Sequence, residues 1–157
     1  AYKQYRAQVE KPWDLICVGA GPLKSLLKDQ AGIEDVGFFQ PADLPAFLKR
    51  RATAFVLPSR KEPWGVVVQE AAASRLPLIC SDACGATVHL LQDGYNGFLF
   101  ETGNVSHLVR CMTNLTALTP EARGIMGQRS YELSKQFTPQ LWAQTLTRGL
   151  QDWNSTR

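Results

Sequence analysis

Short apolar segments alternate with helical patterns along the first two thirds of this 157-residue chain, and this alternation limits the folds open to it. Strands that alternate with helices at this spacing form βαβ units around a parallel sheet. We therefore predict an α/β fold, a Rossmann-like parallel sheet with helices on both faces. The predicted strands are residues 13–18, 36–39, 55–57, 78–80 and 97–100.

Helices are expected between these strands and in the last third of the chain. A Thr-Pro pair opens each of the last two, a common start signal in which Thr caps and Pro fills the first turn. The chain thus reads as one domain, a core at about 1–118 followed by C-terminal helices at 119–157. The predicted helices are residues 23–30, 43–51, ten residues from Gly65, 85–92, 105–118, 120–136 and 139–153.

The composition and charge of the chain indicate which partners and which cellular compartment to expect. The net charge of +3 is mild and the basic residues are scattered, so no nucleic-acid partner is expected. Four cysteines without framework spacing favour a reducing compartment, and no signal peptide or membrane-spanning run is present. We expect a cytoplasmic protein, and any association with the inner face of the membrane would belong to a longer protein. The opening AYKQYRAQVE reads as the middle of a helix, so a fragment is expected.

Residues 55–81 hold the most unusual feature. Glu70 lies among Val and Ala residues in a predicted helix, where a carboxylate is costly unless something pairs with it. Glu62 precedes that helix and Gly65 opens it. Such a helix N-terminus suits phosphate, and a carboxylate one turn along could accept hydrogen bonds from two ribose hydroxyls. The combination predicts a nucleotide site.

In open parallel sheets, ligands bind beyond the carboxyl ends of the strands. Two loops fit this position, residues 19–22 with Gly19 and Gly21, and residues 59–65. The first loop lacks the third glycine of a dinucleotide fingerprint, because Lys24 occupies that position. NAD is therefore not predicted.

The segment EPWGVVVQE, from Glu62 to Glu70, resembles the E-x7-E signature of retaining GT-B glycosyltransferases of family 4, group 1. The flanking segments VGAGPLK, VGFFQPADLPAFL and CGATVHLLQDGYNGFLF resemble the same family, so the similarity covers nearly the whole chain. The resemblance implies the C-terminal, donor-binding half of such an enzyme. An N-terminal acceptor domain and a basic pair that neutralises the diphosphate would lie outside this sequence.

Site residues follow from this resemblance. It implies that Glu70 holds the donor ribose and that Glu62, as the catalytic residue, faces the transferred sugar. Backbone N–H groups of Trp64, Gly65, Val66 and Val67 would contact sugar and diphosphate. The loop at residues 38–40, with Phe39, would border the base, and Gly19 and Gly21 would complete the donor site.

The implied reaction moves a sugar from UDP- or GDP-sugar to a glycan or lipid-linked acceptor, with retention and without a bound metal or other cofactor. One departure from the family pattern is Arg75, which stands where a glycine usually allows a left-handed helix end.

Other interpretations stay open. Glu70 could be a core carboxylate with a structural partner, and the whole chain could be a non-catalytic α/β nucleotide-binding or regulatory module. A related nucleotide-sugar epimerase is a third option. No metal site is predicted, because the remaining candidate ligands lack suitable spacing, namely His89, His107, Cys80 and Cys84.

Overall fold

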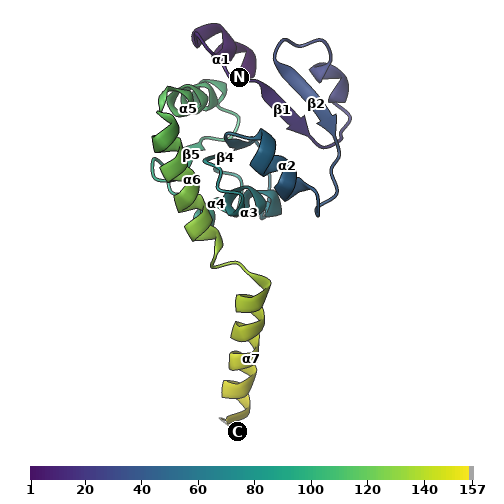
Figure 1. The fold of residues 1–157 in the computed structure, drawn as a ribbon. Coiled ribbons are helices and arrows are strands. Elements are labelled where there is room, and N and C mark those ends of the chain that lie inside the picture. Colours follow the sequence, from purple (N-terminus) through teal and green to yellow (C-terminus); the bar gives the residue numbers. More distant parts are fainter. Residues whose placement is uncertain (156–157) are drawn as a thin grey trace.

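The fold is α/β in a computed structural model that describes residues 1–155 (Figure 1). Its strands are β1 (Leu15–Val18), β2 (Ile33–Gly37), β3 (Phe55–Leu57), β4 (Leu78–Ser81) and β5 (Gly97–Phe100). The helices are α1 (Tyr2–Gln8), a 3-10 turn η1 (Lys24–Leu27), α2 (Leu44–Arg51), α3 (Val66–Ala73), α4 (Thr87–Leu90), α5 (Val105–Ala117), α6 (Pro120–Ser134) and α7 (Pro139–Ser155).

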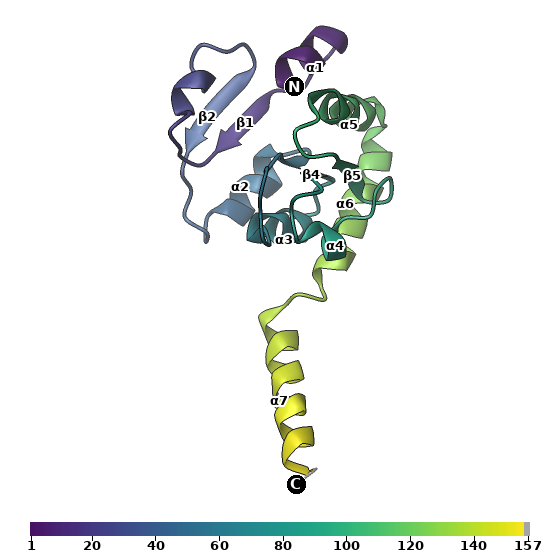
Figure 2. The ribbon, with the colours of Figure 1, turned by 180° about the vertical axis from the view of Figure 1, so that it is seen from behind.

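All strand pairs are parallel, as predicted, but the prediction of one continuous sheet is wrong. β1 pairs with β2, and β4 pairs with β3 and β5 in the order β3-β4-β5, so there are two sheets among the described residues. Both views of the ribbon show the β1–β2 ribbon set apart from the other strands (Figures 1 and 2). Adjacent apolar segments can each satisfy one strand edge without pairing with each other, and sequence does not reveal which edges meet.

How deeply each strand is buried depends on whether both of its edges are paired. Every residue of β4, which has neighbours on both edges, is buried, whereas no residue of β1 or β3 is. Yet β1 (LICV) and β3 (FVL) are continuous apolar runs of the kind found in inner parallel strands. Each therefore has one open edge in a sequence suited to an inner strand.

The predicted helix at 23–30 is also wrong, because only the single turn η1 forms there. Leu23 is 68% and Leu26 65% exposed, so no apolar face stabilises a longer helix. The second strand is shifted, since β2 starts at Ile33 and includes Glu34 and Asp35. Charged residues are tolerated in β2 because it is an edge strand. They interrupt the apolar pattern that predicts a strand, so the predicted start was too late.

The C-terminal helices form as predicted, with Thr119 accepting from the Ala122 N–H (3.2 Å) and Thr138 accepting from the Leu141 N–H (3.2 Å). α6 packs on α3, whereas α7 projects from the body and contains no buried residue (Figure 1). Residues 156–157, the end of the predicted C-terminal segment, lie outside the described part. No helix within 1–155 is long and apolar enough to cross a bilayer.

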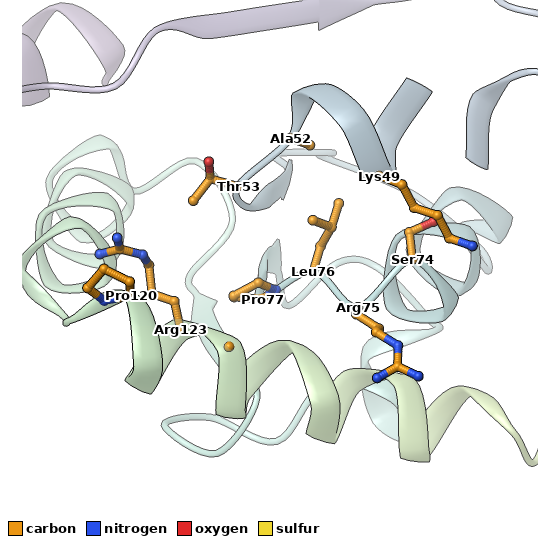
Figure 3. A pocket seen from close by; sticks show the side chains of 10 residues that line it. Lys49, Ala52, Thr53, Ser74, Arg75, Leu76, Pro77, Pro120 and Arg123 are labelled. Carbon is orange, nitrogen blue, oxygen red and sulfur yellow. The ribbon is translucent and has the colours of Figure 1, made fainter. Parts of the chain in front are cut away.

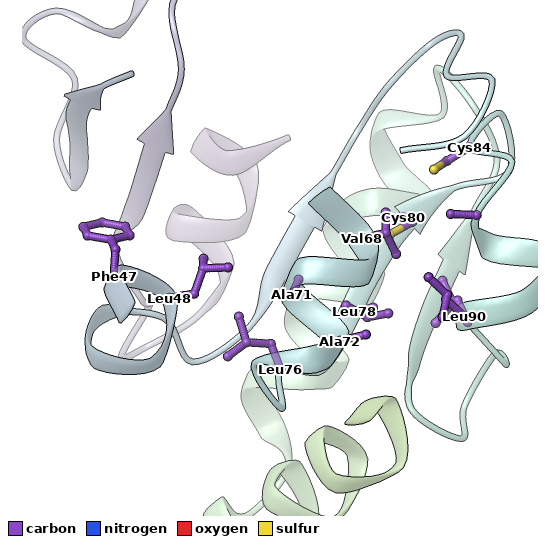
Figure 4. Close-up of a cluster of buried hydrophobic side chains, with 12 residues drawn as sticks. Phe47, Leu48, Val68, Ala71, Ala72, Leu76, Leu78, Cys80, Cys84 and Leu90 are labelled. Atoms are coloured by element: carbon purple, nitrogen blue, oxygen red, sulfur yellow. The ribbon is translucent and has the colours of Figure 1, made fainter. Parts of the chain in front are cut away.

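α3 lies at the centre of the larger core cluster, which also draws on α2, β4 and α4 (Figure 4). The buried face of α3 packs into this cluster through Val68, Ala71 and Ala72. Two residues after the end of α3, Arg75 has a φ of 62°, which is left-handed although the residue is not glycine. Its guanidinium lies 4.4 Å from the Tyr131 ring centroid on α6, a contact that helps to offset the strain. The left-handed helix end that Arg75 argued against is therefore present.

Candidate functional site

Gly65 sets the entry to α3. Its φ of 95° is left-handed, and a Cβ built there would lie 2.8 Å from Cys84 Sγ and 3.2 Å from Glu62 Cγ. Both the backbone angle and the lack of space require glycine. Because glycine has no side chain, Gly65 cannot cap the α3 N-terminus, and no other side chain within the described residues caps its first N–H groups, which an anion could therefore bind.

The loop between β4 and α4 holds the loop before α3 in place. Glu62 N–H donates to Ala83 O (3.2 Å), Gly85 N–H to Glu62 O (3.0 Å) and Ala86 N–H to Trp64 O (2.8 Å). Cys84 Sγ also donates to Trp64 O, at 3.1 Å. These bonds run along the backbone like a short parallel bridge, so the shape of residues 62–65 is imposed by residues 83–86.

The two glutamates differ in their surroundings. The Glu62 carboxylate accepts a hydrogen bond from the backbone N–H of Trp64, at 3.3 Å. The Glu70 carboxylate has no hydrogen-bond or ion-pair partner within residues 1–155, and burial raises its pKa. The interpretation of Glu70 as a core carboxylate with a structural partner is thus contradicted. A half-buried, unpaired carboxylate is costly, so a ligand that supplied donors would gain free energy from it.

Two valines open the helix beside these carboxylates. Val66 is 60% exposed and Val67 is half-buried, so this apolar flank of the helix N-terminus lies at the surface. Glu62, Trp64 and Glu70 are half-buried as well, whereas Gly65 is buried.

The other predicted site residues lie on the β1–β2 ribbon and beside it. Gly19 (φ 129°) donates its N–H to Gly37 O at 2.7 Å, and Gly21 lies in the exposed turn that follows. Within residues 1–155, no hydrogen bond joins this turn to residues 62–65. Phe39 points inward, with its ring centroid 4.5 Å from that of Phe47, while its neighbour Phe38 is 68% exposed.

Sequence reasoning missed the residues that support the site. Gly85 is one, since its role depends on the carbonyl of Pro63, which is distant in sequence but would be 2.1 Å from a Cβ on Gly85. Phe137 is another, and its ring meets that of Trp64. A glycine at the start of a predicted helix, five residues after the predicted strand at 78–80, was the available signal for Gly85. Phe137 had none.

The defined cavities lie elsewhere. One of about 520 Å³ lies at the amino ends of β3 and β4, and Figure 3 shows its three cationic side chains, Lys49, Arg75 and Arg123, pointing in different directions. A second, of about 620 Å³, is bordered by the segment after α1 and by α5. In the part of the chain that the structure describes, no group of three His, Cys, Asp or Glu side chains is placed to hold a metal ion.

The family profile and the related sequences that this chain matches all describe sugar transferases. The sequence profile described as "Glycosyl transferases group 1" matches residues 1–133. An uncharacterized glycosyltransferase of Haemophilus influenzae is 30% identical over 138 residues, which are 85% of this chain and 39% of that protein. The sulfoquinovosyl transferase SQD2 of Arabidopsis thaliana is 37% identical over 87 residues, 53% of this chain and 16% of that protein.

Solved structures share the fold. Sucrose-phosphate synthase from Thermosynechococcus elongatus superposes with a TM-score of 0.80 at 20% identity, covering 98% of this chain and 41% of its own. Anabaena HepE in complex with UDP and glucose superposes at 0.74 with 21% identity, covering 92% of this chain and 43% of its own. The α/β fold prediction is confirmed, and the chain spans about two fifths of the length of these proteins.

Proposed function

The chain belongs to the family of group 1 glycosyl transferases, and from this premise we propose that it is the donor-binding domain of a retaining glycosyltransferase. The domain binds a UDP- or GDP-sugar, and the whole protein transfers the sugar to a glycan or lipid-linked acceptor. Three structures of one neighbour, Anabaena HepE, are complexes with UDP, with UDP and glucose, and with UDP-glucose, which supports a nucleotide-sugar as the ligand.

The unpaired Glu70 carboxylate beside the glycine-opened N-terminus of α3 carries this proposal. Burial raises its pKa and no neighbour offsets the cost, so the site is incomplete without a ligand that donates hydrogen bonds. Two adjacent hydroxyls of a ribose provide such donors. A charged acceptor bound in this way contributes about 1.5–3 kcal/mol per bond.

The N-terminus of the same helix binds the diphosphate of the nucleotide. The uncapped N–H groups at Val66 and Val67 and the helix dipole receive the diphosphate, since developing negative charge is stabilised there as the sugar leaves. Glu62 lies one residue before the Pro63–Trp64 pair that leads into the helix, and its carboxylate faces the transferred sugar. Gly19, Gly21 and the loop at Phe39 border the remaining part of the donor from the β1–β2 ribbon.

The acceptor is bound by a second domain outside these residues, which also supplies, or is accompanied by, the basic pair that neutralises the diphosphate. The setting we propose is polysaccharide or lipid-linked glycan assembly at the cytoplasmic side of the membrane. No metal or other cofactor takes part.

Titration of the chain with UDP and with GDP, followed by ligand-observed NMR, tests the proposal. We expect weak but saturable binding of one of them and at least a tenfold loss in Glu70→Ala, because two charged hydrogen bonds are removed. Glu121→Ala, which removes an exposed carboxylate on α6, is the matched control and should bind as the wild type does. Equal binding by Glu70→Ala would overturn the assignment of Glu70.

A further inference from the structure

Three aromatic rings from distant parts of the sequence meet behind the candidate site. The ring centroid of Trp64 lies 5.8 Å from that of His89 on α4 and 5.7 Å from that of Phe137, and His89 and Phe137 are 5.5 Å apart. We refer to Trp64, His89 and Phe137 as the aromatic triad. Phe137 lies in the turn that joins α6 to α7, so this turn touches the loop before α3.

Hydrogen bonds fix the same turn to two more elements around the site. Gln69, the neighbour of Glu70 on α3, donates from Nε2 to the carbonyl oxygen of Phe137. Gln136 donates from Nε2 to the carbonyl oxygen of His89, at 3.4 Å. The turn is therefore held by α3, by α4 and by the loop before α3, although the helix that follows it buries no residue.

Trp64 connects this turn to Glu62. Its N–H donates to the Glu62 carboxylate at 3.3 Å, and its carbonyl oxygen accepts from Ala86 N–H and Cys84 Sγ. The next residue, Gly65, begins α3. The ring of Trp64 lies against Phe137 while its backbone N–H holds the Glu62 carboxylate, so a shift of the whole residue would disturb the carboxylate and the helix entry together.

We infer that Phe137 is a positioning residue for the donor site, acting through the ring of Trp64 and the side chain of Gln69; this inference rests on the proposed function. We assign Phe137 no contact with the donor itself. Its ring and carbonyl restrict the two residues that adjoin the site, so that less ordering remains to be done when the nucleotide binds.

A merely structural role would predict loss of stability and unchanged affinity. Leu133 offers the matched control, because it is a partly buried, non-aromatic residue near the same end of α6 that packs on the same core cluster. Phe137→Tyr keeps the ring and is the conservative variant.

The experiment measures UDP and GDP dissociation constants and thermal midpoints for the wild type, Phe137→Ala, Phe137→Tyr and Leu133→Ala at a temperature where all are folded. We expect Phe137→Ala to bind about 3–10-fold more weakly, from the loss of aromatic contacts. Phe137→Tyr and Leu133→Ala should keep wild-type affinity even if Leu133→Ala melts lower. Unchanged affinity in Phe137→Ala, or an equal loss in Leu133→Ala, would overturn the inference.

Backbone amide shifts of the ligand-free protein separate this inference from the proposed function. We expect the signals of Glu62 and Gly65, which Phe137 does not touch, to shift in Phe137→Ala and not in Leu133→Ala. If the wild type binds neither nucleotide but these shifts occur, the proposed function fails while the positioning by Phe137 stands. If the shifts are absent, the positioning fails.

Discussion

The carbonyl oxygen of Pro63 occupies the place where a side chain on Gly85 would begin, since a Cβ built on Gly85 would lie 2.1 Å from it. The same glycine donates its N–H to Glu62 O at 3.0 Å. The backbones of the two loops that flank the α3 N-terminus thus touch, with no room for a side chain at this point. The geometry of the candidate site depends on this contact.

Gly85→Ala is expected to destabilise the chain by about 1–3 kcal/mol, because the contact is with backbone that cannot move aside without breaking the hydrogen bonds around Glu62 and Trp64. Urea unfolding measures the change. Gly149→Ala, in the exposed helix α7 with nothing within 4 Å of the new methyl group, is the control; it should not destabilise, and helix propensity gives it a gain of at most about 0.5–1 kcal/mol. A free energy of unfolding for Gly85→Ala within about 0.5 kcal/mol of wild type would contradict this account.

Two glycines in α6 provide a matched pair. A Cβ on Gly127 would lie 2.1 Å from Arg75 O, whereas one on Gly124 would meet nothing within 4 Å. Gly124→Ala should therefore stabilise by about 0.5–1 kcal/mol through helix propensity, and Gly127→Ala should destabilise by about 1–3 kcal/mol. Thermal or urea unfolding of both variants checks the difference. Changes of the same sign would show that the packing of α6 on the end of α3 is not tight.

Glu70→Gln should stabilise the chain at neutral pH while weakening nucleotide binding. Burial raises the pKa of Glu70, so between its unfolded pKa, about 4.3, and its folded pKa the native state binds more protons than the unfolded state. Stability from this group is present below that window and is lost as pH rises through it. The advantage of Glu70→Gln should thus appear above the window, as a rise of about 1–2 °C in melting temperature, and vanish near pH 4.

The control for this pH dependence is Glu121→Gln. Hydrogen bonds from its own backbone N–H and from Thr119 lower the pKa of Glu121 in the folded state. The ionised Glu121 therefore stabilises the chain above its unfolded pKa, and this stabilisation is lost as the pH falls through its folded pKa. Its variant should be less stable than wild type at neutral pH. If Glu70→Gln were also less stable at neutral pH, the carboxylate would have a partner that the structure lacks.

The cysteines should differ in reactivity. Burial raises the pKa of Cys80 to about 12, and this thiol has no exposed surface. Cys17 is only half-buried on β1. At pH 8 an alkylating reagent should modify Cys17 at least about tenfold faster than Cys80, because the thiolate reacts and must be reached by the reagent. Peptide mass spectrometry after timed alkylation measures the rates, and equal labelling would mean that β4 opens readily.

Several features of this protein were readable in its sequence because they depend on near neighbours. The periodicity of apolar residues located most helices and four of the five strands within a few residues, and the Thr-Pro pairs marked the starts of α6 and α7. Glu70 was recognisable as anomalous from its Val and Ala neighbours alone. The spacing of Glu62 and Glu70 around a glycine pointed to the family.

Other features depend on which distant segments meet, and tertiary structure alone decided them. Local propensity argued against a left-handed Arg75, yet the contact with Tyr131 and the packing on Gly127 hold it there. Phe39 turned toward Phe47, β1 and β3 kept open edges, and Phe137 came to lie against Trp64. The composition of residues 62–70 thus determined what chemistry the site can offer. Long-range packing decided which distant residues hold the site in place, because such contacts have no fixed spacing along the chain.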